Sequence, residues 1–532
     1  MHSPVDERRP LLADTPSPHS SSHSTDETTA VAENETMVPS RQVPAPVTNN
    51  VGSLFASLVV DSIPVILTYV LQNSIQTVSI LVVGRLGPDE LSAAAFSLMF
   101  AMIFDPTFFS CHAGWCVALG GTTALDTLGS QAFTGGDRPT DVSIHLQRCI
   151  FLLWLLFVPV AVLWAFVDPV LRMFGQDERL SHDVQRFLRV LIAGAPGYIA
   201  FESLKKYLQC QGIMRAATAV LIMVAPINLV ANIIFVYHTP LGVLGSPVAI
   251  SLTYWIAFFI LVLLTYLSPT HARNKTWGGL QLGVALDLQS SLTFLQLAIP
   301  GILMVGTEWA AFEIVALAAG KLGALPLAAQ SIIMTADQIL NTIPFGIGVA
   351  ASTRVGNLIG LRSAVSAKQA SHASAMLSMI VGLIVMVTLI ATKDDFGKIF
   401  SDDTDVVKLV SKVMPLVASF QVADGLAGSC GGVLRGQGRQ HLGALFNLVA
   451  YYVLALPLGI TLAFHPRTHL GLQGLWIGQV VALFIVGIGE YAVVWLGTDW
   501  DKEVEKGVER NREETKRRLM HSEASRQHSS AF

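Results

Sequence analysis

Residues 63–87 read IPVILTYVLQNSIQTVSILVVGRLG, and residues 299–323 read IPGILMVGTEWAAFEIVALAAGKLG. Both stretches open with Ile-Pro, continue through an apolar segment of helical length and end in Gly-basic-Leu-Gly, at a constant shift of 236 residues, from 63 to 299. Farther along, Gly121 aligns with Gly348 and Gly129 with Gly356 at a shift of 227. A repeat of this kind predicts two related bundles of membrane helices in the same orientation, with a cleft between them.

The composition agrees with a membrane protein. The 532 residues are 52% hydrophobic and only 14% charged, which excludes an ordinary soluble protein. We predict an all-α polytopic membrane protein with twelve transmembrane helices, arranged as two six-helix bundles related by a pseudo-two-fold axis along the membrane normal around a central cleft. The predicted spans are 54–83, 91–114, 143–166, 184–209, 216–237, 243–267, 290–319, 325–355, 366–391, 405–434, 441–463 and 471–496.

The spans divide the chain into four parts. Residues 51–280 form the first bundle and residues 281–498 the second. Residues 1–50, rich in Ser, Thr and Pro, and residues 499–532, dominated by Lys, Arg and Glu, are expected to be disordered cytosolic tails. The change of shift from 236 to 227 leaves nine extra residues in the first half around Asp105, which are either a real insertion or an artefact of the gene model.

The basic residues indicate the orientation. Lys and Arg gather in both tails and in the predicted connections after even-numbered spans, and we therefore expect both termini to face the cytosol. These residues are Arg138, Lys205, Lys206, Arg215, Arg273, Lys275, Arg362, Lys368, Arg435 and Arg439. Near the N-terminus, Glu7, Leu11 and Leu12 match an acidic dileucine signal that sorting adaptors read, so the vacuolar membrane and the plasma membrane both stay open.

Acidic residues inside the apolar segments are the strongest candidates for function, because an intramembrane charge is costly and normally faces a cavity. Glu308 and Glu313 lie in the seventh span, Asp337 in the eighth and Asp424 in the tenth. Five residues along a helix place Glu308 and Glu313 about 140° apart, so we expect one to line the cleft and the other to contact a neighbouring helix.

The repeat predicts where proton chemistry occurs. At the shift of 236, Glu308 corresponds to Gln72 and Glu313 to Thr77, and both equivalents are uncharged. Titrating groups should therefore lie in the second bundle. Asp337 has a structural alternative, since it could cap local polar groups together with Gln338 and Asn341.

Two further residues have competing interpretations. Trp309 could stack on an organic substrate or could simply be a packing aromatic. Glu202 has Lys205 and Lys206 at i+3 and i+4, the spacing of an ion pair on a helix surface, and we predict a surface pair there.

Several motifs, taken in order, resemble the multidrug and toxic compound extrusion family, particularly its eukaryotic branch, over about residues 54–496. They are Gly84-Arg85-Leu86-Gly87, Ala124-Leu125-Asp126-Thr127-Leu128-Gly129-Ser130-Gln131-Ala132, Glu308-Trp309-Ala310-Ala311-Phe312-Glu313, Ala328-Ala329-Gln330-Ser331, Ala350-Ala351-Ser352-Thr353-Arg354-Val355-Gly356-Asn357 and Gly431-Gly432-Val433-Leu434-Arg435-Gly436.

The resemblance implies an antiporter that exports organic, often cationic, compounds from the cytosol by alternating access, usually in exchange for protons. The family's functional positions fall on Glu308, Glu313 and Asp424. One position departs from the pattern, because Thr335 stands where some animal members have a further glutamate in the eighth span, and Asp337 follows two residues later.

Other classes of protein fit less well. No GxxxxGK[ST] phosphate loop occurs, and no paired nucleophile and base suggests an enzyme. Five cysteines without a CxxC pair do not indicate a metal site. We expect no cofactor besides the coupling proton, and a monomer that contacts membrane lipid and a small organic substrate but no nucleic acid. A sodium-coupled exporter of the same fold and a flippase for lipid-linked substrates remain alternatives.

Overall fold

The computed structural model describes residues 51–87, 114–173 and 176–530, together with positions 90, 92–95, 97 and 98. Contacts divide the chain into Met1–Pro46 and Val47–Phe532, and every described residue belongs to the second unit. The sorting signal at Glu7, Leu11 and Leu12 and the extra residues around Asp105 lie outside the described residues.

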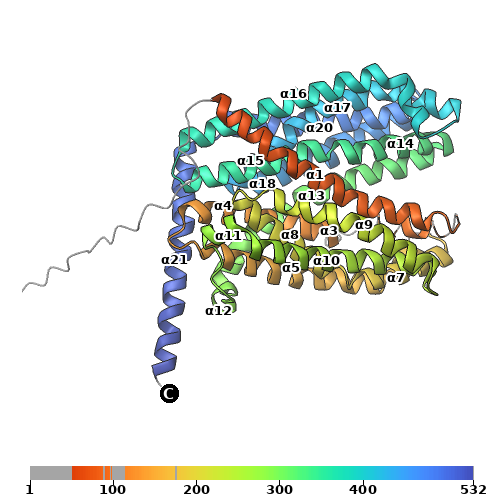
Figure 1. The fold of residues 1–532 in the computed structure, drawn as a ribbon. Helices are drawn as coiled ribbons and strands as arrows, with labels where there is room; N and C mark the ends of the chain where they lie inside the picture. Colours follow the sequence, from red (N-terminus) through yellow and green to blue (C-terminus); the bar gives the residue numbers. More distant parts are fainter. Residues whose placement is uncertain are drawn as a thin grey trace, which may run out of the picture. The chain divides into compact units, whose positions relative to one another are not determined.

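All regular structure in the described residues is helical (Figure 1). The first half contains α1 (Val51–Val83), α3 (Gly114–Gly121), α4 (Thr123–Gly135), α5 (Asp141–Ala165), α6 (Val167–Met173), α7 (Glu178–Leu191), α8 (Ala195–Cys210), α9 (Arg215–Tyr237), η1 (Gly242–Leu244) and α10 (Gly245–Leu267). Two short helices, α11 (Pro269–Asn274) and α12 (Leu282–Ala285), lead to the second half.

The second half contains α13 (Leu288–Leu322), α14 (Ala324–Leu340), α15 (Thr342–Gly360), α16 (Ala364–Phe396), η2 (Gly397–Ile399), α17 (Thr404–Gln437), α18 (Gln440–Asn447), the π-helical segment η3 (Leu448–Ala455), α19 (Leu456–Phe464) and α20 (Leu472–Trp495). A last helix, α21, covers Trp500–Ser530.

Ten helical segments in the described part of the chain are long and apolar enough to cross a membrane, or eleven if α7 and α8, which meet at a 51° bend, form one span. Large apolar side chains such as Leu155, Ile384 and Val387 are exposed on these helices, as expected for surfaces that face lipid rather than water. The predicted all-α fold is therefore confirmed, and the arrangement fits twelve helices in two bundles.

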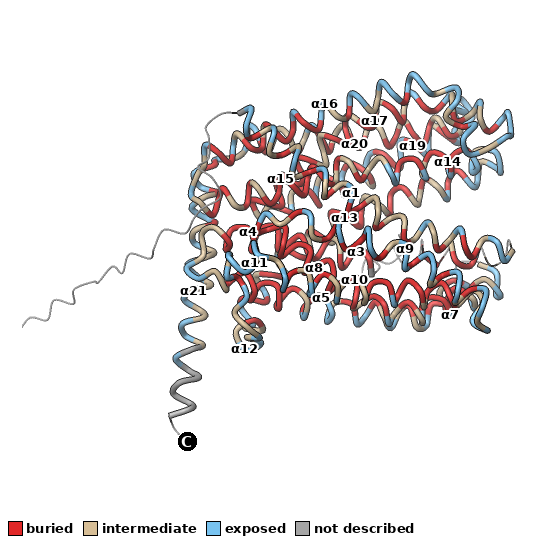
Figure 2. Tube along the Cα trace, viewed as in Figure 1, coloured by how far each residue is buried: buried red, intermediate tan, exposed pale blue. Residues whose placement is uncertain are grey.

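Each bundle has its own apolar core, and Figure 2 shows the buried residues concentrated between the helices. One large cluster joins α5, α7, α8 and α10 around residues such as Trp115 and Phe187, and another joins α13, α14, α17 and α20 around Phe312 and Trp476. Because lipid supplies no hydrophobic drive between helices, close contact between small residues becomes important where the bundles meet.

The bundles meet chiefly where α15 contacts α1 and α4, and where α13 contacts α3. Glycines permit the close approach of α4 and α15: a β-carbon at Gly360 would lie 2.6 Å from the carbonyl oxygen of Gln131, and one at Gly356 would lie 2.7 Å from the β-carbon of Ser130. Thr134 on α4 also donates a hydrogen bond of 2.7 Å to the carbonyl of Asn357 on α15.

The predicted end of the second span at residue 114 is wrong. Helices α3 and α4 continue from Gly114 to Gly135, and α4 is almost fully buried. This stretch carries Gly, Thr, Ser and Asp side chains that lower its hydropathy, because it packs against protein rather than lipid. The eighth predicted span, 325–355, is likewise present but consists of two helices that meet at Asn341.

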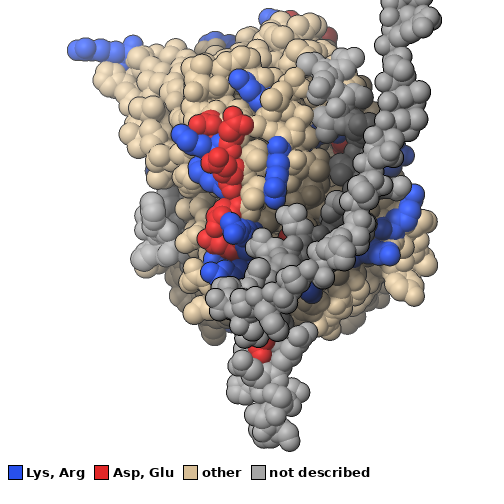
Figure 3. Space-filling model, turned by 90° about the vertical axis from the view of Figure 1, so that its left-hand side faces the viewer, with Lys and Arg blue, Asp and Glu red and all other residues tan. Residues whose placement is uncertain are grey.

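The expectation of a disordered C-terminal tail is also wrong. Helix α21 runs across the ends of the bundle helices (Figure 1), on a face where acidic and basic side chains gather (Figure 3). Arg510 donates hydrogen bonds to the side chain of Gln131 on α4 (2.8 Å) and to the carbonyl of Gln437 on α17 (3.0 Å), so α21 contacts both bundles.

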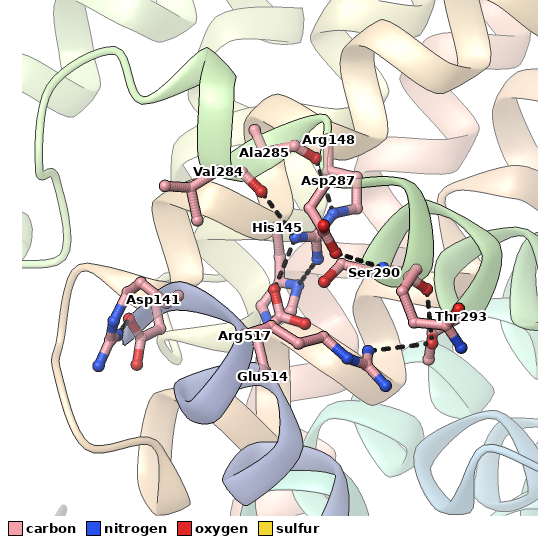
Figure 4. A network of polar contacts seen from close by, with 12 residues as sticks. Asp141, His145, Arg148, Val284, Ala285, Asp287, Ser290, Thr293, Glu514 and Arg517 are labelled. Atoms are coloured by element: carbon pink, nitrogen blue, oxygen red, sulfur yellow. Dashed lines mark hydrogen bonds and ion pairs between the residues drawn. The ribbon is translucent and has the colours of Figure 1, made fainter. Parts of the chain in front are cut away.

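Farther along α21, Glu514 forms an ion pair of 2.6 Å with Arg148 of α5 (Figure 4), and Arg518 pairs with Asp141 at the start of α5. The composition of residues 499–532 does not predict this helix, because their charges would be expected to face solvent, whereas in the structure they pair with fixed partners on the bundle.

Three basic residues lie elsewhere than predicted. Lys205, Lys206 and Arg435 were expected in connections at the membrane surface, but they are buried on α8 and α17.

Candidate functional site

A cavity in the second bundle gathers acidic side chains from three helices. Glu308 comes from α13, Asp424 from α17 and Glu490 from α20, and all three side chains line the same space. The lining is completed by Met304, Val305, Trp309, Asn341, Phe345, Ala427, Gly428, Arg435, Asn447, Leu483 and Val486. We call this space the carboxylate cavity.

Asp424 is held in place by an amide side chain of the eighth span. Its carboxylate is 3% exposed and accepts a hydrogen bond of 3.3 Å from the side-chain amide of Asn341, the residue between α14 and α15. Asn341 itself keeps helical backbone angles, φ −60° and ψ −23°, and its N–H donates to the carbonyl of Asp337 at 2.8 Å, so the amide donor projects from a span that continues across this junction.

The neighbouring cavity lies between the bundles and contains no acidic side chain. It is lined by aromatic and amide residues, namely Tyr69, Gln72, Asn73, Gln76, Trp115, Tyr198, Trp309, Gln338, Asn341 and Phe345, with Cys116, Leu119, Val305 and Thr342. Four residues, including Trp309 and Asn341, line both cavities, so the two spaces adjoin. We call this second space the aromatic cavity.

The predicted site residues divide into two groups. Glu308, Asp424, Trp309 and Asn341 line the carboxylate cavity, whereas Glu313, five residues farther along α13, lines neither cavity. The two glutamates therefore point differently, in the way their spacing on the helix predicts.

The remaining candidates have local partners. Asp337 accepts a hydrogen bond of 3.0 Å from Gln421 on α17. Thr335 donates to the carbonyl of Ser331 on its own helix. Gln72 lines the aromatic cavity and donates a hydrogen bond of 2.8 Å to the hydroxyl of Tyr198. None of these three side chains lines the carboxylate cavity.

Sequence reasoning missed Glu490 and the role of its surroundings. This side chain is fully buried, and neither carboxylate oxygen has a hydrogen-bond partner among the described residues. The sequence does point to Glu490, because it is an acidic residue inside the apolar span 471–496. A charge there is as costly as at Glu308 and normally faces a cavity.

The first bundle holds a buried group of charges that the sequence led us to place on a helix surface. Lys205 pairs with Glu202 at 2.7 Å, Lys206 pairs with Asp126 at 2.9 Å, and all four side chains are at most 1% exposed. The predicted surface pair is thus wrong in its burial, although the spacing of Glu202 and Lys205 was informative. Because each acid faces a cation, these charges largely compensate one another.

Two ion pairs connect the bundles in the described residues, one between Arg354 of α15 and Asp61 of α1 at 3.8 Å and one between Arg435 and Asp126. The guanidinium nitrogen Nε of Arg435 lies 3.7 Å from Oδ2 of Asp126, so the basic residue of the carboxylate cavity reaches the first bundle. No group of three or more His, Cys, Asp or Glu side chains with the geometry of a metal site occurs in the described residues.

Comparison with known proteins gives consistent matches over most of the chain. Residues 64–234 and 300–461 match the family described as MatE, with one matched range in each bundle. A transporter of Schizosaccharomyces pombe, named only as uncharacterized, is 36% identical over 449 residues, which covers 84% of this chain and 81% of that protein. Human multidrug and toxin extrusion protein 1 is 34% identical over 425 residues, which covers 80% of this chain and 72% of that protein. The crystal structure of the eukaryotic MATE transporter AtDTX14 is similar at a TM-score of 0.77 and 28% identity, covering 86% of this chain and all of that one (100%).

Proposed function

Because the chain belongs to the MatE family of membrane transporters, in its eukaryotic branch, we propose that it is a secondary antiporter that exports organic cations in exchange for protons. The observation that carries the proposal is the carboxylate cavity, where Glu308, Asp424 and Glu490 come together with Arg435 as the basic residue of its lining. Three acids against one base leave an excess of negative charge when the acids are ionised.

Such a cavity can hold either protons or a cation. Burial in a low-dielectric site favours the neutral form of a carboxylic acid, while a bound cation favours the ionised form. Substrate and protons therefore compete for the same charge. In the proposed cycle, an organic cation binds Glu308 and Asp424 from the cytosol, and protons from the opposite side neutralise these acids and release it.

The driving force follows from this competition. Each unit of pH difference supplies about 1.4 kcal/mol per proton, and a membrane potential adds about 2.3 kcal/mol per charge for every 100 mV. A gradient of one or two units is therefore sufficient to accumulate a cation about tenfold to hundredfold per proton exchanged.

The adjoining aromatic cavity supports an organic substrate rather than a bare metal ion. Trp115 and Trp309 offer aromatic faces and Asn73 offers an amide group, whereas the ring of Tyr69 already has the Lys205 ammonium 4.2 Å from its centre. Aromatic faces attract organic cations, and apolar walls with few polar groups suit a range of flat molecules.

We further propose that the end of the bundles covered by α21 faces the cytosol, in agreement with the distribution of Lys and Arg in the turns and in α21. Glu313, outside both cavities, then has a supporting role on α13. The membrane in which the protein acts is the vacuolar or the plasma membrane.

The test uses the purified full chain in liposomes with a pH gradient and ethidium as a fluorescent organic cation. We expect ethidium to accumulate on the acidic side for the wild type and not for Glu308→Gln. Glu503→Gln on α21 is a matched control, since Glu503 is 4% exposed but bonds to Lys506 on its own helix, and it should transport normally. Uptake that follows a sodium gradient and ignores pH, or movement of lipid without ethidium, would contradict the proposal.

A further inference from the structure

Arg435 stands between two sets of acids that belong to different bundles. Its side chain is 5% exposed and forms the long ion pair of 3.7 Å with Asp126 of α4, while it also lines the carboxylate cavity with Glu308 and Glu490. Nitrogens Nε and Nη2 of its guanidinium have no hydrogen-bond partner in the described part of the chain. The pair with Asp126 is therefore an electrostatic contact that leaves hydrogen-bonding capacity unused.

Asp126 does not depend on Arg435. Both of its carboxylate oxygens accept hydrogen bonds from Lys206, at 2.9 and 3.0 Å, and Lys206 belongs to the same bundle. If Arg435 moved away, Asp126 would keep a close cation. Breaking the ion pair between Arg435 and Asp126 therefore costs less free energy than removing the only cation beside a buried acid would.

Glu490 is in the opposite situation. It is completely buried and its two oxygens are unpaired, which is costly for an ionised carboxylate. A β-carbon built on Gly431 would overlap Cε of Met304 and would lie 3.4 Å from Oε2 of Glu490 and 3.7 Å from Nη1 of Arg435, so both charged groups border the same position, which the Met304 methyl group occupies. For the Arg435 guanidinium to reach Glu490, both its own side chain and that of Met304 have to rotate.

The backbone around Arg435 lies on the contact between the bundles. Thr127 of α4 donates a hydrogen bond to the carbonyl of Arg435, and Gln131 donates one of 2.9 Å to the carbonyl of Gly436. Alternating access requires the two bundles to separate at this end during part of the cycle. Separation would pull Asp126 away from Arg435, because the two residues sit on opposite sides of the contact.

We propose that Arg435 is a positioning residue that changes partner, from Asp126 when the bundles are closed at the α21 end to Glu490 when they open there, and that Glu490 exchanges a proton as this happens. The inference rests on the proposed proton antiport and extends it to a named pair of residues. In the closed arrangement Glu490 has no cation and holds a proton taken from the opposite side. In the open arrangement Arg435 compensates its charge, and the proton leaves to the solution at the α21 end.

The direction agrees with export. If the α21 end is cytosolic, protons enter the cytosol as the cavity becomes accessible to a cytosolic cation. The groups that face Glu490 from its neighbours are Glu308 on α13, Arg435 and Cys430 on α17, and Tyr451 on η3. Among these four, only Arg435 is a cation, so the partner for an ionised Glu490 has to be this residue.

The experiment measures ethidium binding to the purified full chain in detergent as a function of pH, together with the protons released on binding. For Glu490→Gln we expect fewer protons released per ethidium and a shallower pH profile, while Glu490→Asp should largely restore both. For Asp126→Asn, which frees Arg435, the pH midpoint should fall by about one unit, the size expected when an acid gains a nearby cation. This shift should disappear in the double variant Asp126→Asn with Glu490→Gln.

Controls separate the possible failures. Glu503→Gln should leave the pH profile of ethidium binding unchanged. If Asp126→Asn does not fold, Arg435→Gln takes its place. We expect Arg435→Gln to raise the pH midpoint, and to raise it less when Glu490→Gln is also present. A shift that is equal with and without Glu490, or a wild-type profile for Glu490→Gln, would overturn the partner change. If instead wild-type binding ignores pH and Glu308→Gln binds normally, the proposed proton antiport itself fails.

Discussion

The ion pair between α21 and α5 gives a prediction whose size can be worked out from the structure. Arg148 is 1% exposed and Glu514 is 19% exposed, and their atoms are 2.6 Å apart (Figure 4). Removing one partner of a buried pair commonly costs 3–5 kcal/mol. Arg148 keeps hydrogen bonds to the carbonyls of Ala285 (2.8 Å) and Val284 (3.3 Å), so we expect Glu514→Gln to cost about 2 kcal/mol, the value of a charge-assisted hydrogen bond.

That cost should appear as local release of α21 rather than as unfolding of the bundles. A change of about 2 kcal/mol raises the population of the released helix about 30-fold, and amide hydrogen exchange in residues 505–520 should accelerate by that factor. Glu513→Gln is the matched control, because Glu513 is 53% exposed and its bond to Arg517 is worth only about 0.5 kcal/mol. Equal acceleration in the two variants would refute the reasoning.

The same contact predicts a dependence on pH. Burial by itself would raise the pKa of the Glu514 carboxyl, but the charges of His145 and Arg148 and the hydrogen bond from Arg148 hold it below its usual value. A pKa that is lowered in the folded state stabilises the contact at and above the ordinary value near 4.3, and this stabilisation is lost as pH falls through the lowered value. The protection of α21 amides, measured against their intrinsic exchange rate at each pH, should therefore fall in acid for the wild type, and the variant Glu514→Gln should lack this response.

Three further outcomes are expected. Gly432→Ala should lower the melting temperature, at a cost of about 1–3 kcal/mol, because a β-carbon there would overlap the carbonyl oxygen of Gly348 on α15, whereas Gly283→Ala, with open space around it, should not. Glu313→Gln should keep a clear part of the pH-driven uptake, since this side chain lines neither cavity, and complete loss would show that its role was misjudged. Trp309→Ala should weaken ethidium binding about tenfold or less, and Trp309→Phe should recover most of it, because the aromatic face is what the substrate contacts.

The spans that face lipid were predictable because their apolar length is set by the bilayer. The span containing α3 and α4 was not, since the small polar residues of α4 that bring it close to α15 also remove the hydropathy signal. The interruption at Asn341 has a cause in the sequence, because Pro344 has no N–H to donate to the carbonyl of Leu340, but only the contact of Asn341 with Asp424 shows what lies there.

Within the site, the sequence predicted which acidic residues are buried better than it predicted which residues they contact. Glu308 and Asp424 were found because an acid inside an apolar span is costly. Asp337 fits the same rule but bonds to Gln421 away from the carboxylate cavity, and Glu202 looked like a surface residue although its partners are buried with it. The order of α21 could not be read from its charges, because Arg148, which pairs with Glu514, is distant in the sequence.

The most direct test of the account is whether a substrate gradient alone moves protons. Liposomes containing the full chain and ethidium, with equal pH on both sides, no sodium and the membrane potential clamped, are diluted into ethidium-free buffer while an internal pH dye is followed. We expect the lumen to acidify as ethidium leaves, and to stay unchanged with Glu308→Gln. If ethidium leaves through the wild-type protein while the internal pH stays constant, transport is not coupled to protons and the central claim is wrong.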